Sequence, residues 1–380
     1  MSTPAPPSRR RLLAGVLPML LAGTGIMRPA LAAGPAMPAL RELAARRGLV
    51  YGSCAAAQQI VLAPDDFTAL LARECALIVP ENEMKWAEMS DGPGQEDYSL
   101  PDRMVAFAQA RRMAFRGHTM LWYWRTPGWF SDLGRAAAEA AMLRRVTEMA
   151  TRYRGRIYAW DVVNEPVNPQ DGRPDGLRRA VFLDKIGPAY LDLAYRAARA
   201  ADPGARLVLN EYDVEYDTPL HDAKRAAVLR VVERMKAAGT PLDAVGIQGH
   251  LSVGRYPFSP VKLRRFLAAL AGMGLQLQVT ELDVTDELAP ADIAERDRLV
   301  ADEYARFLDV ALAERAVKLV VTWGLSDRHS WIVRHETNTM KWRTDGTAER
   351  PLPFDAALRR KPAWYALASA FAGAPHRDPG

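Results

Sequence analysis

The sequence predicts an α/β protein built as a single (β/α)8 TIM barrel, and three observations lead to that fold. Eight short apolar runs alternate with amphipathic stretches from about residue 49 onward. Turn residues that end helices stand between many of them, for example Gly155 and Gly274. No Pro/Gly/Ser-rich linker interrupts the alternation. Eight βα units in one unbroken series are typical of one closed barrel rather than of two domains.

The first four predicted strands are residues 49–52, 77–80, 113–118 and 157–163. Before the third strand, Met104, Phe107 and Ala108 recur at the three- and four-residue spacing of a helix that buries one face. Gly155 ends the helical stretch before the fourth strand. Each of these strands therefore follows a helical segment or a turn, as a βα repeat requires.

The last four predicted strands are residues 207–209, 244–247, 275–279 and 319–321. The turn at residues 202–204 (DPG) precedes the fifth strand. An apolar stripe at Val228, Val231 and Met235 predicts the next helix, which Gly239 ends. The 380 residues thus suffice for one large barrel preceded by a leader.

The composition excludes several classes of protein. With 49% hydrophobic and 25% charged residues, the chain is globular rather than disordered or collagen-like. Two cysteines, Cys54 and Cys75, cannot build a disulfide scaffold, and we expect both to be buried thiols. Four of the 50 Lys and Arg residues lie within the first 32 residues, which leaves 46 basic against 45 acidic residues in the rest. We therefore expect no nucleic-acid partner.

Residues 1–32 are predicted to be an export signal of the twin-arginine type. Arg9 and Arg10 precede an apolar run that ends near Gly23, and residues 30–32 are small, as at a cleavage site. A membrane anchor is disfavoured because a span needs roughly 18 apolar residues, and Pro18 interrupts this shorter run. We expect a catalytic domain at residues 33–380 that is periplasmic or secreted, monomeric and free of the membrane after cleavage.

Polar and aromatic residues follow seven of the eight predicted strands. In a TIM barrel the chemistry lies at the carboxyl ends of the strands, so these segments form the candidate site. They are residues 81–86, 118–122, 164–166, 210–212, 248–250, 280–283 and Trp323.

Two carboxylates in these segments, Glu165 and Glu281, suit the hydrolysis of a glycosidic bond. One protonates the leaving oxygen while the other attacks or activates water. Glu165 alone equally fits a turn before Pro166, whereas Glu281 shares strand parity with Leu277 and Val279 and so continues a line of apolar residues. The partner residues are ambiguous when taken singly, because lysines and histidines are often structural and tryptophans often belong to the core. Their common position at one rim favours sugar binding, in which indole rings stack on pyranose faces.

Six motifs, in order along the chain, closely resemble those of glycoside hydrolase family 10, the endo-1,4-β-xylanases. They are residues 81–86 (ENEMKW), 116–119 (RGHT), 160–165 (WDVVNE), 246–250 (GIQGH), 280–284 (TELDV) and 323–327 (WGLSD). The resemblance extends from about residue 48 to 372. It implies a (β/α)8 barrel that hydrolyses internal bonds of xylan and xylo-oligosaccharides with retention of configuration, and it implies no cofactor and no metal.

The resemblance also implies roles for individual residues. Glu165 is the acid/base, Glu281 is the nucleophile, and Asn164 binds the 2-hydroxyl of the sugar that is cleaved. Further substrate contacts are implied for Glu81, Asn82 and Lys85 at the adjoining non-reducing-side sugar, for His118 and Trp122 at the reacting sugar, and for Trp323 and Trp331 as a stacking wall. Gln248 is expected to hold Glu281, and His250 to bond Glu281 while Asp283 orients it.

The segment Tyr123–Arg125 departs from the family pattern, which usually has His and a short polar pair after the tryptophan. Trp124 and Arg125 are expected beside the non-reducing-side sugar, unless they turn outward and pack under the loop. In the first case, an indole and a guanidinium would either favour a carboxylate-bearing decoration of the polymer or crowd out a neutral one.

The residues leave three other functions open. A barrel cellulase or mannanase shares residues 164–166 (NEP) but not the motif at residues 81–86. A non-catalytic carbohydrate-binding barrel would retain the fold, although both carboxylates are present. A metal-dependent hydrolase would have to use Asp327, His329 and His335, whose spacing fits no ligand pattern.

Overall fold

The computed structural model of the chain describes residues 37–333 and 343–378. The predicted export signal at residues 1–32 and the candidate ligand His335 lie outside these residues. One compact unit extends from Pro38 to Gly380. Within the described ranges, no helix combines the length and the apolar character needed to cross a bilayer.

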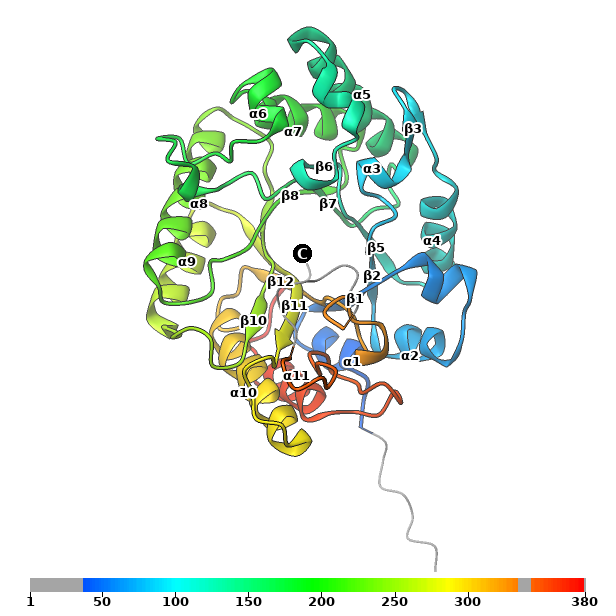
Figure 1. Cartoon of the computed structure of the whole chain (residues 1–380), viewed down its shortest axis with the longest axis vertical. Helices are drawn as coiled ribbons and strands as arrows, with labels where there is room; N and C mark the ends of the chain where they lie inside the picture. The colour runs from blue at the N-terminus through cyan, green and yellow to red at the C-terminus, as the bar shows by residue number, and fades with distance from the viewer. Residues whose placement is uncertain (1–36, 334–342, 379–380) are drawn as a thin grey trace, which may run out of the picture. The chain divides into compact units, whose positions relative to one another are not determined.

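Eight parallel strands form a closed ring, and each of them overlaps one of the predicted apolar runs (Figure 1). They are β1 (Val50–Ala55), β2 (Leu77–Pro80), β5 (Ala114–Gly117), β7 (Ala159–Asn164), β8 (Arg206–Glu211), β9 (Ala244–Ile247), β11 (Gln276–Thr285) and β12 (Val317–Thr322). Each strand pairs with the next in this order, and β12 pairs with β1 to close the ring. The predicted (β/α)8 barrel is confirmed.

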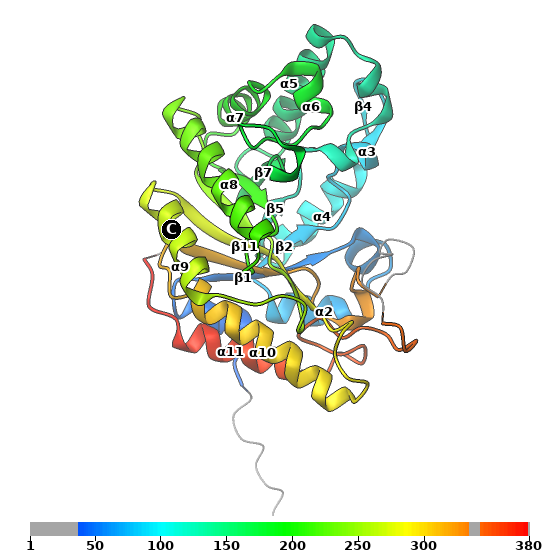
Figure 2. The same cartoon turned by 60° about the vertical axis from the view of Figure 1, so that its left-hand side comes forward.

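The helices lie outside the ring of strands (Figures 1 and 2). They are α1 (Leu40–Ala45), α2 (Asp66–Glu74), α3 (Trp86–Met89), α4 (Ser99–Ala110), α5 (Arg135–Arg152), α6 (Val181–Ile186), α7 (Tyr190–Ala201), α8 (Pro219–Ala237), α9 (Pro260–Gly272), α10 (Ile293–Ala311) and α11 (Pro362–Gly373). The side chains of Thr218, Ser259 and Asp292 accept backbone N–H groups at the starts of α8, α9 and α10. These caps satisfy donors that would otherwise lack partners.

Two very short strands extend the barrel at its carboxyl end. β6 (Leu121–Trp122) pairs with the end of β7, and β10 (His250–Ser252) pairs with the end of β11. Trp122 and His250 are thereby held against the two strands that carry the candidate carboxylates. The remaining elements are the hairpin of β3 (Ser90–Gly92) with β4 (Gln95–Glu96) and the short helices η1 (Gln58–Leu62), η2 (Tyr123–Arg125), η3 (Gly128–Asp132), η4 (Pro169–Asp171) and η5 (Asp327–His329).

The barrel interior is packed with apolar side chains. Cys54 lies in a cluster inside the ring with residues from β2 and β12, and both Cys54 and Cys75 are buried free thiols, as predicted. Gly117 is required by packing, because a Cβ atom there would lie 2.0 Å from the Trp160 ring. Trp160 is itself fully buried.

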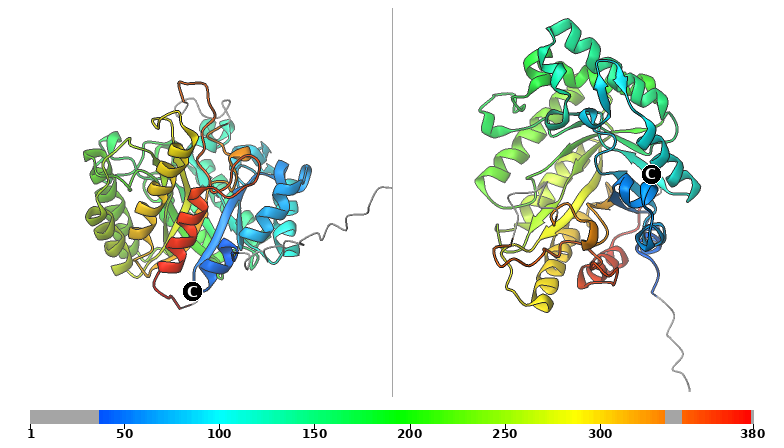
Figure 3. Two further views of the ribbon diagram at one scale, coloured as in Figure 1. Left: turned by 90° about the horizontal axis from the view of Figure 1, so that it is seen from below. Right: turned by 45° about the vertical axis from the view of Figure 1, so that its right-hand side comes forward.

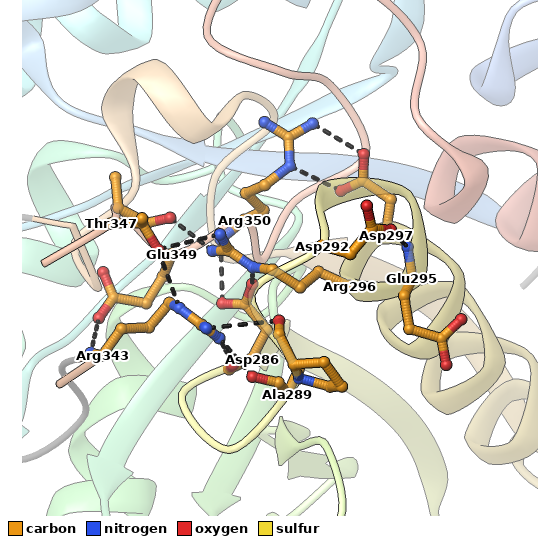
Figure 4. A network of polar contacts seen from close by, with 12 residues as sticks. Asp286, Ala289, Asp292, Glu295, Arg296, Asp297, Arg343, Thr347, Glu349 and Arg350 are labelled. Atoms are coloured by element: carbon orange, nitrogen blue, oxygen red, sulfur yellow. Dashed lines mark hydrogen bonds and ion pairs between the residues drawn. The ribbon is translucent and has the colours of Figure 1, made fainter. Parts of the chain in front are cut away.

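A network of arginines fixes the loops after β11 (Figure 4). Nε of Arg296 donates to Asp286 at 2.6 Å, and Arg343 donates to the backbone carbonyls of Asp286 and Ala289 at 2.5 and 2.9 Å. Arg350 forms two parallel hydrogen bonds of 2.8 Å with Asp297 on α10. The segment from residue 343 to 350 is thus tied to α10, which in turn lies beside α11 (Figure 3).

Candidate active site

Glu165 follows directly after β7 in a left-handed backbone conformation, with a φ of 57°. Such a conformation costs about 1 kcal/mol or more for a residue with a Cβ atom, so its neighbours must hold it. The N–H of Glu165 donates to the carbonyl of Asn210 at 2.9 Å, and its own carbonyl accepts Nε of Arg178 at 2.8 Å. These backbone contacts place the Glu165 carboxyl group at the carboxyl end of the barrel.

The Glu165 side chain is only 8% exposed and is surrounded by amides. Its Oε1 accepts Nε2 of Gln248 at 3.0 Å and Nδ2 of Asn164 at 3.3 Å. Both donors are neutral. The carboxyl group is therefore oriented without a direct hydrogen bond to a cation among the described residues.

Glu281 lies in the middle of β11 and is 5% exposed. Its Oε1 accepts Nδ2 of Asn210 at 2.7 Å, and its Oε2 lies 3.3 Å from Nε2 of His250. Burial by itself would raise the pKa of Glu281, but the hydrogen bond from His250, the electrostatic effects of His118 and His250 and the hydrogen bond from Asn210 lower it to about 2. Glu281 is therefore ionised at neutral pH.

His250 links Glu281 to a buried acid. Its Nδ1 lies 2.8 Å from Oδ1 of Asp283, whose other oxygen accepts Nε1 of Trp331 at 2.7 Å. Burial alone would lower the pKa of His250, but Asp283 and Glu281 outweigh it and raise the pKa to about 10. Protonated His250 donates from both ring nitrogens, and the contacts predicted for His250 with Glu281 and Asp283 are present.

The contact predicted for Gln248 was wrong in one respect. Its side-chain amide donates to Glu165, whereas the expected partner was Glu281. Gln248 does hold Glu281, but through its backbone carbonyl, which accepts the Glu281 N–H at 2.8 Å. The reason is geometric. The backbones of Gln248 and Glu281 are neighbours where β9 pairs with β11, and the side chain of Gln248 extends away from Glu281 to Glu165 at the end of β7.

Asn210 was not among the residues singled out from the sequence, yet it contacts both the carboxylate of Glu281 and the backbone of Glu165. Its backbone carbonyl accepts the N–H of Glu165, and its Nδ2 lies 2.7 Å from Glu281 and 2.8 Å from Oδ1 of Asn164. Gly246 makes room for it, since a Cβ atom there would lie 2.2 Å from Oδ1 of Asn210. The available signal was its position in the polar segment after the fifth strand.

His118 rests on a buried ion pair. Its Nδ1 lies 2.9 Å from Oδ2 of Asp161, and the same carboxylate binds Arg116, whose Nε donates to Gln278 at 3.1 Å. All four side chains are buried. The His118 ring also packs edge-on against Trp323, with ring centroids 5.2 Å apart. His118 thus has a fixed orientation beside Glu281, whose pKa it helps to lower.

Three predicted binding residues cluster after β2. Nζ of Lys85 donates to Oδ1 of Asn82 at 2.9 Å, and Nδ2 of Asn82 donates to Glu81 at 3.4 Å. The ammonium group of Lys85 also lies 4.9 Å from the centre of the Trp122 ring. Burial lowers the pKa of Lys85, although Glu281 and Glu81 oppose this effect.

The predicted tryptophans lie around the two histidines. Trp323 packs on His118, and Trp331 packs on His250 with ring centroids 5.5 Å apart. Trp331 also packs against the interior cluster that contains Trp323. The ring centroids of Trp122 and His118 are 6.4 Å apart, and Trp122 lies opposite Asn164 in the β6–β7 pairing. All predicted site residues therefore meet at one end of the barrel.

The candidate metal ligands are engaged in other contacts. Asp327 pairs with Nζ of Lys361 at 2.9 Å, and the ring of His329 packs edge-on against Phe67 at 4.7 Å. In the described part of the chain, no group of three or more His, Cys, Asp or Glu side chains is arranged to hold a metal ion.

Asn210 donates to the ionised carboxylate of Glu281 and accepts the backbone N–H of Glu165. Among the described residues, the Glu165 carboxyl group accepts hydrogen bonds only from neutral amides, and indole rings pack on the two neighbouring histidines. A TIM barrel with these groups at the carboxyl ends of its strands is a glycoside hydrolase. The profile of glycosyl hydrolase family 10 matches residues 39–370. The chain belongs to this family, and the predicted family and enzyme class are confirmed.

Characterised relatives match the chain over most of its length. Endo-1,4-beta-xylanase 1 of Humicola insolens is 33% identical over 348 residues, which cover 90% of this chain and 76% of the relative. Endo-1,4-beta-xylanase A of Phanerodontia chrysosporium is 34% identical and covers 87% of this chain and 77% of its own. The crystal structure of xylanase 10B from Thermotoga petrophila RKU-1 in complex with xylobiose superimposes with a TM-score of 0.78 at 28% identity, over 88% of this chain and 97% of that chain.

Proposed function

We propose that the enzyme is an endo-1,4-β-xylanase that hydrolyses internal β-1,4-xylosidic bonds of xylan and xylo-oligosaccharides with retention of configuration. The carrying observation is the ionised, doubly hydrogen-bonded carboxylate of Glu281, joined through Asn210 to Glu165. An ionised carboxylate held in this way suits the nucleophile of a double displacement, and Glu165 supplies the second carboxyl group that this mechanism needs. The xylanases among the relatives, and a structural relative described with xylobiose, support xylan as the substrate class.

In the first step, Glu281 attacks the anomeric carbon and forms a glycosyl-enzyme ester. Glu165 gives its proton to the glycosidic oxygen, so the bond from the anomeric carbon to that oxygen breaks as the ester bond forms. A nucleophile must be ionised before it attacks, and the lowered pKa of Glu281 meets this requirement. Asn164 hydrogen-bonds the 2-hydroxyl of the reacting sugar as positive charge develops at the anomeric carbon.

In the second step, Glu165 accepts a proton from water, whose oxygen attacks the anomeric carbon. The ester bond to Glu281 breaks, the carboxylate is released, and the second inversion restores the original configuration. His250 and Asn210 then hold the freed carboxylate. The cycle consumes one water for each bond cleaved and needs no cofactor.

The remaining predicted residues bind the polymer. Glu81, Asn82 and Lys85 form a hydrogen-bonded row suited to the hydroxyl groups of a sugar on the non-reducing side. His118 and Trp122 border the reacting sugar, and Trp323 and Trp331 present ring surface for stacking. The chain is further proposed to act as a monomer outside the cytoplasm, after removal of residues 1–32.

Product analysis tests the substrate and the mechanism together. The enzyme should release reducing ends from linear xylan and far fewer from cellulose or mannan. Proton NMR of fresh digests should detect the β-anomer first, because retention yields the α-anomer only through mutarotation. Faster hydrolysis of cellulose or mannan would mean that this polymer, and not xylan, is the substrate. Initial appearance of the α-anomer would mean that Glu281 acts as a base toward water, and xylan binding without turnover would indicate a binding protein.

A further inference from the structure

The segment Tyr123–Arg125 lies beside the catalytic rim. It forms η2, directly after β6, and β6 brings Trp122 into register with Asn164 on β7. Asn164 is the residue before Glu165. The unusual sequence of η2 is therefore next to the acid/base rather than on a remote surface.

Aromatic rings form a continuous row from the site to this segment. The ring centroids of Trp323 and His118 are 5.2 Å apart, those of His118 and Trp122 are 6.4 Å apart, and those of Trp122 and Trp124 are 6.2 Å apart. Trp124 is 63% exposed, the largest value among the exposed large hydrophobic side chains of the described residues. Its ring is tilted by only 32° from that of Trp122. The row thus ends in an open indole surface, which suits the apolar face of a sugar.

The backbone of η2 is held in place by its neighbours. The guanidinium of Arg178 lies 4.3 Å from the centre of the Tyr123 ring, and the hydroxyl of Thr126 donates to the carbonyl of Trp122 at 2.9 Å. Arg178 also binds the backbone of Glu165. Trp124 is therefore exposed on a fixed turn, which lowers the entropic cost of binding a sugar there.

Arg125 has donors available for a ligand. Nε of Arg125 lies 3.8 Å from Oε1 of Glu88, beyond hydrogen-bond distance, and both side chains are 42% exposed. Nε of Arg125 is buried without a hydrogen-bond partner, so a ligand has to reach the terminal nitrogens of the guanidinium, which make no hydrogen bond to any residue that the structure describes. In contrast, Arg350 already forms two bonds to one carboxylate. A guanidinium with unused donors favours a planar carboxylate over a neutral hydroxyl group.

Building on the proposed xylanase function, we propose that Trp124 and Arg125 form an outer subsite for acidic xylan on the non-reducing side. The indole stacks on a backbone sugar, and the guanidinium binds the carboxylate of a uronic acid side group carried by the same polymer.

Binding measurements separate the two roles. Glu281→Ala keeps oligosaccharides intact, so calorimetry in this background gives the Kd of xylotetraose and of the same oligosaccharide with one glucuronic acid substituent. Trp124→Ala should weaken binding of both ligands by about 5-fold, because the stacking surface is lost. Arg125→Gln should weaken only the acidic ligand, by about 5-fold, because Gln retains neutral donors but not the charge. This selective loss should shrink as salt is raised.

Two variants far from the site serve as controls. Tyr365→Ala removes another half-exposed aromatic, on α11, and Arg298→Gln removes an exposed arginine on α10 that pairs with Glu295. Both should leave the two Kd values unchanged. An unchanged Kd for Trp124→Ala, or an equal loss on both ligands for Arg125→Gln, overturns the subsite. Failure of the parent enzyme to hydrolyse linear xylan overturns instead the proposed function, independently of these variants.

Discussion

The two candidate catalytic carboxylates are held in opposite ways. Glu281 lies within a regular strand, and its carboxylate contacts a protonated histidine as well as an amide. Glu165 lies one residue beyond its strand in a left-handed conformation, and its carboxyl group accepts hydrogen bonds only from amides among the residues that the structure describes. A nucleophile must stay ionised, whereas an acid/base must gain and lose a proton in each cycle. The barrel thus gives the cationic partner to the strand-borne carboxylate and neutral partners to the one on the turn.

The largest effect should follow from removing the strand-borne carboxylate. Glu281→Ala is expected to lower turnover of every glycoside on the order of 10⁴-fold or more, because in the proposed double displacement no other group can form the covalent intermediate. Assays on xylan and on aryl xylobiosides measure the loss, and circular dichroism shows whether the barrel is intact. Substantial activity in a folded variant would remove Glu281 from the nucleophile role.

Replacing the carboxyl group on the turn should divide substrates by their leaving groups. Glu165→Ala is expected to lower xylan hydrolysis by about 10² to 10⁴-fold, the usual contribution of acid catalysis. An aryl xylobioside with a good leaving group needs little protonation, so pre-steady-state kinetics should still detect a burst of released phenol. Equal losses on both substrates would contradict the assignment of Glu165 as acid/base.

The link between Glu281 and Glu165 can be tested at Asn210. Asn210→Ala removes the hydrogen bond to Glu281 and to Asn164 but leaves the backbone contact with Glu165. We expect a loss of about 10- to 100-fold in kcat/KM, which is typical when a supporting hydrogen bond is removed. The aryl xylobioside and xylan should be affected alike, because the nucleophile serves both. A loss confined to xylan would place Asn210 on the acid/base side only.

Much of this site could be predicted from the sequence, because its residues follow apolar strand segments at one rim. Glu281, His250 and Asp283 come from adjacent strands in motifs with a recognisable order. Asn210 escaped notice because its contact depends on the space above Gly246, a packing feature without a local sequence signal. Gln248 was expected at Glu281 alone, and the contact of its side chain with Glu165 depends on side-chain torsions that the sequence does not specify.

The strand positions were also predictable, whereas their irregularities were not. The apolar runs mark all eight strands, since a fully enclosed parallel strand is buried on both faces. The pairing of β11 with β12 shifts between Val279 and Leu282, on either side of Glu281. Such bulges redirect side chains near active sites. The left-handed conformation of Glu165 likewise depends on Asn210 and Arg178, both distant in sequence.

A variant of His250 tests whether Glu281 needs its cationic partner. His250→Ala is expected to lower activity by about 10-fold or more, because Glu281 loses a cationic donor. The acid limb of the kcat/KM profile should move to higher pH, since the pKa of Glu281 rises once the hydrogen bond is gone. Kinetics and a pH profile like those of the parent enzyme would make His250 a purely structural residue.

The same group contributes to the pH dependence of stability. The pKa of folded His250 is about 10, above its ordinary value near 6.5. The contribution of His250 to the free energy of unfolding is therefore fully present below about pH 6.5 and is lost as the pH rises toward 10. Urea unfolding from pH 6 to 10 should show this decline in the parent enzyme and a weaker one in His250→Ala. Identical slopes would mean that His250 gains no proton affinity on folding.

The smallest effect should come from the residue that holds the turn of Glu165. Nε of Arg178 donates to the Glu165 carbonyl, Nη2 donates to Tyr212 at 2.8 Å, and the guanidinium covers the Tyr123 ring. Arg178→Lys keeps the charge but loses the planar fork that makes these contacts together. Because only the acid/base is displaced, kcat on xylan should fall about 5-fold. The release of a good aryl leaving group should stay near the rate of the parent enzyme. An unchanged pH dependence with the aryl substrate would show that Glu281 is undisturbed. Arg173→Lys, at a partly buried pair with Asp175, is the matched control and should alter neither rate. Equal losses of Arg178→Lys on both substrates would show that the arginine supports the whole rim rather than the turn, and the two carboxylates would then share one scaffold instead of two.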